Sequence, residues 1–401
     1  MVGVIYVLRI MIPYHMDPTI MLAFGEDAPD QAQYARALIG HVTVREAFGH
    51  DGQVFFVQAN DPWFLQPDLH AVHFDRPVYR AQRMGYPTIA AGFGLFPPAV
   101  VAWTLPLVNI CALAAGCLAA SRLARLLGGS SWLGLAFCLN PGVLSEVDIS
   151  GGGVLALAFG TFGVLAAERE KLWPAAATLT GAALSRETML AFAAAVAWIL
   201  WRRRIRRWWL LLAVPVATAA AWAIYVRIRL GGLPSTAFRE LATYPFAGPI
   251  EAFAYWRQEP LSLLTISAFL AVCTAFAIRV VASRQILGWA ALPSLLIASG
   301  LSVSVWRFPY DIARALAPVL LAYPLLAFIE EPKASREELV AFQKAVQYVI
   351  AETRRLHRLG LSPDDALKQA KWGEYTQWML ADQQGIVAIR KIYEELEGTL
   401  K

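Results

Sequence analysis

The feature that most constrains this chain is a series of apolar segments that approach the length of a membrane-spanning helix. A helix needs about 20 predominantly apolar residues to cross the hydrocarbon core. Lipid offers the backbone no hydrogen-bond partners, so such segments are expected to be helical. The clear candidates are Ala99–Ala120, Trp132–Glu146, Val154–Ala167, Trp208–Val226, Leu261–Val281, Ile286–Val305 and Ala313–Ile329. The chain is therefore predicted to be an all-α, polytopic membrane protein.

Composition supports this class. Of the 401 residues, 57% are hydrophobic and 16% are charged, whereas a soluble domain carries about a quarter charged residues. The net charge of +5 arises largely in short loops beside apolar segments, as the positive-inside rule requires, so we expect no nucleic-acid partner. The four cysteines all lie in apolar runs and are expected to be small core residues. We expect no removable signal peptide, because no small-residue cleavage site follows the first apolar stretch.

Two further regions bring the predicted number of spans to about ten. The apolar stretch between Leu172 and Trp201 is interrupted by Ser185-Arg186-Glu187. We predict two short, tilted helices here, because a single span would leave two charged side chains unpaired in lipid. The segment Met1–Phe24 is broken by charged residues and proline. It is either a truncated first span or one that begins with an interfacial stretch.

The distribution of basic residues predicts the orientation. Clusters at 122–125, 169–171, 202–207 and 279–284 fall at every second crossing, which places them in the cytoplasm. Both termini are then cytoplasmic, as in a multi-pass protein of the cell (inner) membrane. Residues 25–86 form a large outer loop. Residues 229–260 form a second outer loop, which could hold an amphipathic helix on the membrane surface.

Residues 333–401 differ in character from the rest and are predicted to form a soluble, cytoplasmic helical tail. A first helix begins at a capping box of Ser335 and Glu338, a second begins with Ser362 as N-cap, and a third covers about 385–398. These helices have one apolar face and are too short to enclose a large core. We therefore expect the tail to dock onto a protein partner.

Parts of the tail resemble the helical C-terminal extension of some metallo-β-lactamase-fold hydrolases. The matching stretches are Gly360–Ala366, Tyr375–Trp378 and Ala388–Leu396. The HxHxDH metal motif of those hydrolases does not occur in this sequence, so no hydrolase activity is inferred. The resemblance makes a fusion or an assembled gene a hypothesis for the origin of the tail.

The large outer loop holds the residues best suited to chemistry. It combines carboxylates, which can take a proton from a hydroxyl, with arginines, which bind phosphate bidentately. The alternative is a solvated loop in which aspartates cap helices and turns, with Asp51-Gly52 as a turn pair. His70 and His73 could take part in a weak divalent-cation site, but Pro67 and Pro77 disfavour regular zinc geometry there, and the metal ligands are unknown.

Five ordered elements carry a second resemblance. They are His50–Phe56 continuing to Asn60-Asp61-Pro62, then Tyr79–Pro87, Asn140–Gly142, Leu184–Thr188 and Ala313–Pro318. Together they resemble a group of bacterial multi-pass proteins related to the GT-C glycosyltransferase superfamily, which includes PIG-V-like mannosyltransferases. The resemblance covers about residues 17–329.

The resemblance implies roles for particular residues. Asp51 would be the general base or a metal-linked carboxylate, with Glu26 and Asp27 as second-rank acids. Arg80 and Arg83 would bind the donor phosphate. The remaining candidates for substrate binding are Gln53, Asp61, Tyr79, Arg186, Glu187 and Arg314.

Two of these assignments have alternatives, and so does a further pair of acidic residues. Arg186 and Glu187 either support the site or form a salt bridge that fixes the broken helix pair. Arg314 either binds phosphate or anchors the last span at the headgroups, and we favour anchoring. Glu146 and Asp148 end a span and either join the site or cap the surface.

The implied function is transfer of a sugar from a polyprenyl-phosphate-linked donor to a lipid or glycan acceptor at the outer membrane face. A nucleotide sugar is not expected as donor, since the candidate site faces away from the cytosol. The expected partners are membrane lipid and the polyprenyl-phosphate sugar. The alternatives are a non-catalytic membrane subunit or scaffold and a lipid transporter. Few polar residues continue through the predicted bilayer midplane, and no internal repeat is evident, both of which disfavour transport.

Overall fold

The computed structural model describes residues 2–27, 29–45, 49–236, 240–283, 285–329, 336–379 and 383–399. It divides into two compact units, Met1–Glu330 and Glu331–Lys401. The described residues are overwhelmingly helical, which confirms the all-α prediction. Their only paired strands are β1 (Phe24–Gly25) and β2 (Val44–Arg45), which form one short parallel ladder.

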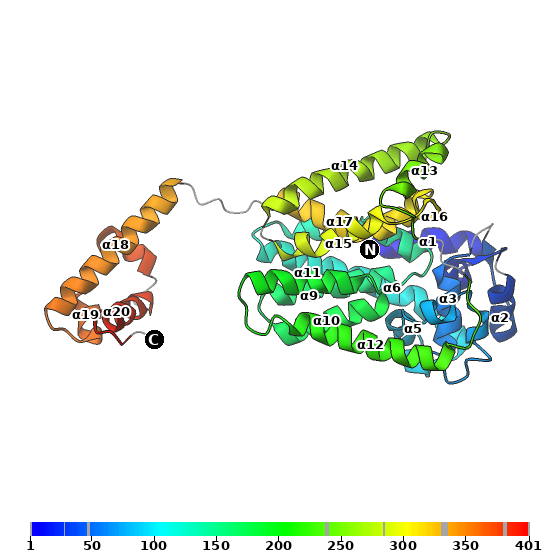
Figure 1. Cartoon of the computed structure of the whole chain (residues 1–401), viewed down its shortest axis with the longest axis horizontal. Helices are drawn as coiled ribbons and strands as arrows, with labels where there is room; N and C mark the ends of the chain where they lie inside the picture. Colours follow the sequence, from blue (N-terminus) through cyan, green and yellow to red (C-terminus); the bar gives the residue numbers. More distant parts are fainter. Residues whose placement is uncertain are drawn as a thin grey trace. The chain divides into compact units, whose positions relative to one another are not determined.

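Four helices among the described residues are long and apolar enough to cross a membrane. They are α6 (Pro98–Leu126), α12 (Leu210–Leu230), α14 (Pro260–Ala282) and α17 (Pro309–Phe328). Shorter apolar helices include α9 (Gly153–Glu168) and α15 (Ile286–Ser299), the latter followed by α16 (Val303–Trp306). Helices α6, α9, α10, α11 and α12 run side by side in the bundle (Figure 1). The chain therefore has the helices of a membrane protein.

The predicted division of residues 172–201 into two short helices is confirmed. Helix α10 (Leu172–Ser185) ends where Arg186 becomes extended, with φ −155° and ψ 119°, and α11 (Met189–Arg202) follows. Arg186 and Glu187 therefore lie in the non-helical break between the two helices.

The prediction of one helix over Trp132–Glu146 is wrong. The stretch forms η5 (Ser131–Gly134), α7 (Leu135–Cys138) and α8 (Pro141–Asp148). The Asn140 side chain accepts a hydrogen bond from the Gly142 amide at 3.0 Å, so it caps a new helix that begins with Pro141. The same side chain donates to the Ala317 carbonyl at 2.8 Å, which fixes this helix start against α17.

The N-terminal segment is interrupted as its composition predicts. Helix α1 (Val2–Met11) is followed by η1 (Ile12–Tyr14), which has proline in its first turn, and then by η2 (Pro18–Leu22). His15 and Met16 between them adopt positive φ. With 10 residues, α1 is shorter than an ordinary span.

The predicted large outer loop, residues 25–86, is a folded cap rather than an open loop. Its elements are α2 (Pro29–Ile39), α3 (Asp51–Asn60), η3 (Ala71–His73), α4 (Pro77–Arg80) and α5 (Gly85–Ala90), with η4 (Gly92–Gly94) after it. Phe56 is fully buried and packs edge-to-face on Phe24 with ring centroids 6.0 Å apart. Helices α2, α3 and α5 gather at one end of the bundle (Figure 1). The buried apolar residues of this cap belong to the same continuous core as those of the bundle.

The second outer loop contains α13 (Ala247–Trp256). Ile250 and Phe253 on this helix are exposed, whereas Ala252 and Trp256 are buried. A helix is therefore present in this loop, but its exposed side chains are largely apolar like its buried ones, so the predicted amphipathic character is not seen.

The tail unit consists of α18 (Arg336–Arg358), α19 (Pro363–Gln369), η6 (Gly373–Met379) and α20 (Gln383–Leu396). The predicted N-cap is confirmed, because the Ser362 hydroxyl accepts from the Asp365 amide at 3.2 Å. The predicted capping box at Ser335 and Glu338 lies outside the residues whose side chains are described. The tail has a small core formed by Leu356, Ala366, Trp372, Ile389 and Tyr393.

Candidate functional site

Asp51 is the first residue of α3, where the helix dipole favours a negative charge. The residue before it, His50, is extended, and Gly52 lies so close to neighbouring backbone that an added Cβ would be 2.3 Å from the Ile149 carbonyl oxygen. Asp51-Gly52 is thus a helix start packed against the bundle, and the alternative of a solvated turn pair is wrong.

Three guanidinium groups converge on the Asp51 carboxylate. Arg80 donates to Oδ1 at 2.7 Å, and Arg83 donates to Oδ2 at 3.4 Å. Arg314, from α17, donates to Oδ2 as well. The cluster therefore joins the cap to α17, a long helix near the C-terminal end of the unit Met1–Glu330.

Each of these arginines is also bound by a second carboxylate from a different position. Asp75 accepts from Arg80 Nε at 2.8 Å. Glu187 accepts from Arg83 Nε at 2.8 Å and from its Nη2 at 2.9 Å, a bidentate pair. Arg314 has two such partners, Glu146 and Asp311.

Glu146 and Asp311 hold Arg314. Glu146 accepts from Arg314 Nε at 2.9 Å, and Asp311 accepts from Nη1 at 3.2 Å. The Glu146 side chain is only 2% exposed and also accepts from Arg186 at 2.7 Å and from the Gly153 amide at 3.0 Å. The favoured hypothesis for Arg314, an anchor at the headgroups, is therefore wrong, since its guanidinium group lies within the buried cluster.

The cluster is nearly charge-balanced. Its carboxylates are Asp51, Asp75, Glu146, Glu187 and Asp311, and its guanidinium groups belong to Arg80, Arg83, Arg186 and Arg314. Five negative and four positive groups give a formal charge of −1. Burial alone would raise the pKa of Asp51, but Arg314, Arg83 and Arg80 outweigh burial and hold that pKa well below its usual range. While these contacts last, Asp51 is ionised and weakly basic.

Tyr79 lies against the arginines. Its hydroxyl accepts from Arg83 Nη2 at 2.6 Å, and its ring faces the Arg83 and Arg76 guanidinium groups, with centroid distances of 5.1 and 4.8 Å. Arg76 in turn pairs with Glu240 of the second outer loop, with one contact of 2.7 Å. The two outer loops are therefore linked beside the cluster.

Other predicted site residues have local structural contacts instead. Glu26 and Asp27 are exposed, and Asp27 accepts from the Gly49 amide at 3.1 Å. The buried Gln53 accepts from the Gly25 amide at 3.4 Å. Asp61 accepts from two successive backbone amides, both at 2.8 Å, and so caps a turn. Within the described part of the chain, these four side chains have no hydrogen bond to the arginines that bind Asp51.

The histidines of the outer loop are also engaged locally. His70 Nδ1 is 2.5 Å from the Tyr34 hydroxyl, and His73 Nδ1 is 2.8 Å from Asp30. Among the described residues, no group of three or more His, Cys, Asp or Glu side chains is placed to hold a metal ion. The carboxylates of the cluster pair with guanidinium groups, so its donor set is not that of a metal centre.

Glu146 belongs to the cluster, and one signal in the sequence could have identified it. Gly151-Gly152-Gly153 follows this acid closely, and consecutive glycines often mark a close approach of backbone to other groups. An added Cβ at Gly151 would lie 1.8 Å from Glu146 Oε2, and one at Gly153 would lie 2.5 Å from Glu146 Cδ. The glycines make room for the buried carboxylate.

This close approach predicts the effect of a small substitution. We expect Gly153→Ala to displace Glu146 and Arg186 and to destabilise the fold by about 1–3 kcal/mol, as overpacking does. Gly232→Ala is the matched control, since nothing lies within 4 Å of its added Cβ. Melting curves of the two purified variants in the same detergent compare them directly. Equal melting temperatures would contradict this description of the Glu146 site.

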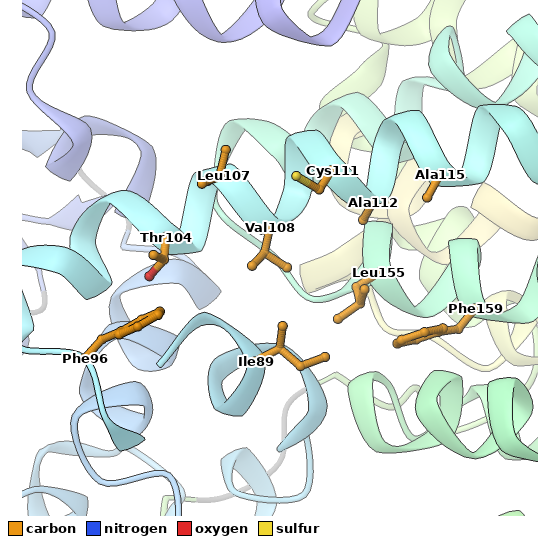
Figure 2. A pocket seen from close by; sticks show the side chains of 10 residues that line it. All are labelled: Ile89, Phe96, Thr104, Leu107, Val108, Cys111, Ala112, Ala115, Leu155 and Phe159. Carbon is orange, nitrogen blue, oxygen red and sulfur yellow. The ribbon is translucent and has the colours of Figure 1, made fainter. Parts of the chain in front are cut away.

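An apolar groove of about 390 Å³ opens between α5, α6 and α9 (Figure 2). Its lining residues are Ile89, Phe96, Thr104, Leu107, Val108, Cys111, Ala112, Ala115, Leu155 and Phe159. Two of the helices that line it also reach the cluster: α5 begins two residues after Arg83, and α9 begins at Gly153, which binds Glu146. Helix α9 therefore borders both the apolar groove and the charged cluster, and α5 begins close in sequence to a cluster arginine.

A scan against protein-family models, a search of curated proteins and a search of solved structures each find no match for this chain.

Proposed function

We propose that this chain is a membrane glycosyltransferase of GT-C type, which transfers a sugar from a polyprenyl-phosphate-linked donor to a lipid or glycan hydroxyl at the outer membrane face. One observation carries the proposal. Three partly buried arginines surround Asp51, and an apolar groove is lined by α5, which begins two residues after Arg83, and by α9, whose first amide binds Glu146 of the cluster. A lipid-linked phosphate requires both features, guanidinium groups for its phosphate and apolar surface for its chain.

The proposed reaction is a substitution at the anomeric carbon of the donor sugar. The acceptor hydroxyl oxygen forms a bond to that carbon, and the bond from the carbon to the phosphate oxygen breaks with its electron pair left on the phosphate. The hydroxyl proton passes to the Asp51 carboxylate. Arg80, Arg83 and Arg314 stabilise the negative charge that develops on the departing phosphate. No step requires a metal ion.

The proposed topology has about ten spans, because short helices such as α9, α10, α11 and α15 can cross when tilted or where the bilayer thins. Both termini are cytoplasmic, the membrane is the cell (inner) membrane, and the Asp51 cluster faces outward. The helical tail supplies a docking element for a protein partner.

Single cysteines test this orientation. In a variant whose native cysteines are replaced by alanine, Leu69→Cys and Lys171→Cys place thiols at exposed positions on opposite predicted sides. We expect a membrane-impermeant maleimide to label intact spheroplasts at position 69 only, and lysed ones at both positions. Labelling of intact spheroplasts at position 171 but not at 69 would reverse the proposed orientation.

The function is tested by transfer in proteoliposomes that contain the purified chain and an acceptor glycolipid. Polyprenyl-phosphate-linked hexoses are supplied in parallel with the corresponding nucleotide sugars. We expect labelled product from a lipid-linked donor and none from the nucleotide sugars. If no donor of either class is used, the enzyme proposal fails.

The saturation of the cluster favours a second candidate, a non-catalytic membrane subunit. All three arginines that touch Asp51 are already paired, so the network could serve only to fix the outer cap on the bundle. Variants separate the two functions. If the network is only structural, variants of its residues should be less stable, and neither they nor the unaltered chain should transfer sugar.

A further inference from the structure

The Asp51 carboxylate has fewer oxygens than there are guanidinium groups around it. It has two oxygens for three guanidinium groups: Oδ1 accepts from Arg80, while Oδ2 is shared by Arg83 and Arg314. The Arg83 contact is correspondingly long, at 3.4 Å. A phosphate monoester has three terminal oxygens, enough for one per guanidinium group.

The arginines do not depend on Asp51 for their positions. Arg80 is held by Asp75, Arg83 by the bidentate pair with Glu187, and Arg314 by two other carboxylates. If the Asp51 carboxylate moved away, three guanidinium groups would remain directed at the same place. Preorganised donors of this kind bind an anion without further ordering cost.

The net charge of the cluster determines how another anion could bind to its arginines. The cluster already carries a formal charge of −1, so adding a phosphate to it would be repulsive. Exchange of one anion for another lowers that repulsion, because the Asp51 charge leaves the arginines as the phosphate arrives. Asp51 is the group best placed to exchange, since it lies at the centre of the cluster on the first turn of α3 and its side chain is 16% exposed.

We propose that the Asp51 carboxylate occupies a phosphate-monoester site, and that a prenyl phosphate binds there by displacing it from the three arginines. This inference rests on the proposed function and deepens it. Among the species in the reaction, the monoester is the departing prenyl phosphate, whereas the sugar donor is a diester with two terminal oxygens. The site therefore favours the leaving group over the donor, and displacement frees Asp51 to accept the acceptor proton.

Binding of farnesyl phosphate to the purified full-length chain, measured by isothermal titration calorimetry, tests the exchange. We expect Asp51→Asn to bind farnesyl phosphate about tenfold more tightly than the unaltered chain, because the negative charge that competes for the three arginines has been removed. Asp148→Asn is the matched control, since Asp148 pairs with Arg45 outside the cluster, at 2.9 Å. It should leave the affinity unchanged. Equal or weaker binding by a folded Asp51→Asn variant would overturn the proposal.

A second measurement does not depend on that variant. The unaltered chain should bind farnesyl phosphate about tenfold more tightly than farnesyl methyl phosphate, a diester that has lost one terminal oxygen and one charge. Farnesol should bind more weakly still. Equal affinities for monoester and diester would also overturn the proposal. Tighter monoester binding without sugar transfer would retain this site and reject the glycosyltransferase, so the two failures are distinguishable.

Discussion

Replacing Arg314 with glutamine is expected to abolish sugar transfer and to lower the free energy of unfolding by about 3 kcal/mol, because it leaves buried carboxylates without their counter-charge. Arg314 has the most carboxylate partners in the cluster: Asp51, Glu146 and Asp311. Its side chain is only 11% exposed, so water cannot replace these partners fully.

The effect of Arg314→Gln is measured by denaturant titration in mixed micelles and by transfer in proteoliposomes. Arg307→Gln is the control, since Arg307 is exposed and lies over the Tyr255 ring, 4.4 Å from its centroid. We expect that control to change stability by less than about 1 kcal/mol. A stable, fully active Arg314→Gln protein would show that the cluster is needed for neither fold nor function.

Replacing Asp51 with asparagine is expected to reduce transfer by about 10³-fold, the usual contribution of a positioned general base. The variant keeps nearly the same shape and retains an oxygen acceptor for the arginines. Its defect should therefore lie in the turnover rate rather than in donor affinity. Initial-rate measurements over a range of donor concentrations separate the two. A variant that transfers sugar at the normal rate would remove Asp51 from the reaction.

The same substitution has a pH signature in stability. The pKa of Asp51 in the folded chain is below its ordinary value of about 4. Its ion pairs therefore stabilise the fold fully above that ordinary value, and the stabilisation is lost as pH falls through the lower, folded-state pKa. We expect the difference in melting temperature between the unaltered chain and Asp51→Asn to be constant from pH 8 to pH 5 and to shrink below about pH 4. A difference that fades between pH 8 and pH 5 would contradict this electrostatic environment.

Much of the helical organisation could be predicted from the sequence, because the signals are local. Apolar length predicted α6, α12, α14 and α17, and the charged pair at 186–187 predicted the break between α10 and α11. Residues 132–146 were misjudged because apolar composition outweighed a local signal, Asn140-Pro141, that starts a new helix. The compact fold of the cap was not predicted, because its core forms by packing against the bundle. Such tertiary packing leaves no local pattern in the sequence.

The candidate site could be predicted only in part, for a similar reason. The motifs led to Asp51, Arg80 and Arg83, which the structure brings together. Apart from Asp311, the ion-pair partners of Arg314 and Glu146 lie far away in the chain, and no local pattern states which of these charges will pair. Composition likewise cannot separate an acid in an ion-pair cluster from one that caps a turn, as Asp61 does.

The rate at which polyprenyl phosphate is released from a labelled polyprenyl-phospho-hexose tests the central claim most directly, because it follows the bond whose cleavage the arginines are proposed to assist. Proteoliposomes with acceptor present would contain the unaltered chain, Asp51→Asn, Arg83→Gln or Asp148→Asn. We predict release by the unaltered chain and by Asp148→Asn at similar rates, and a loss of about 10²-fold or more in the two cluster variants. Release that is absent from the unaltered chain, or equal in all four proteins, would contradict the account.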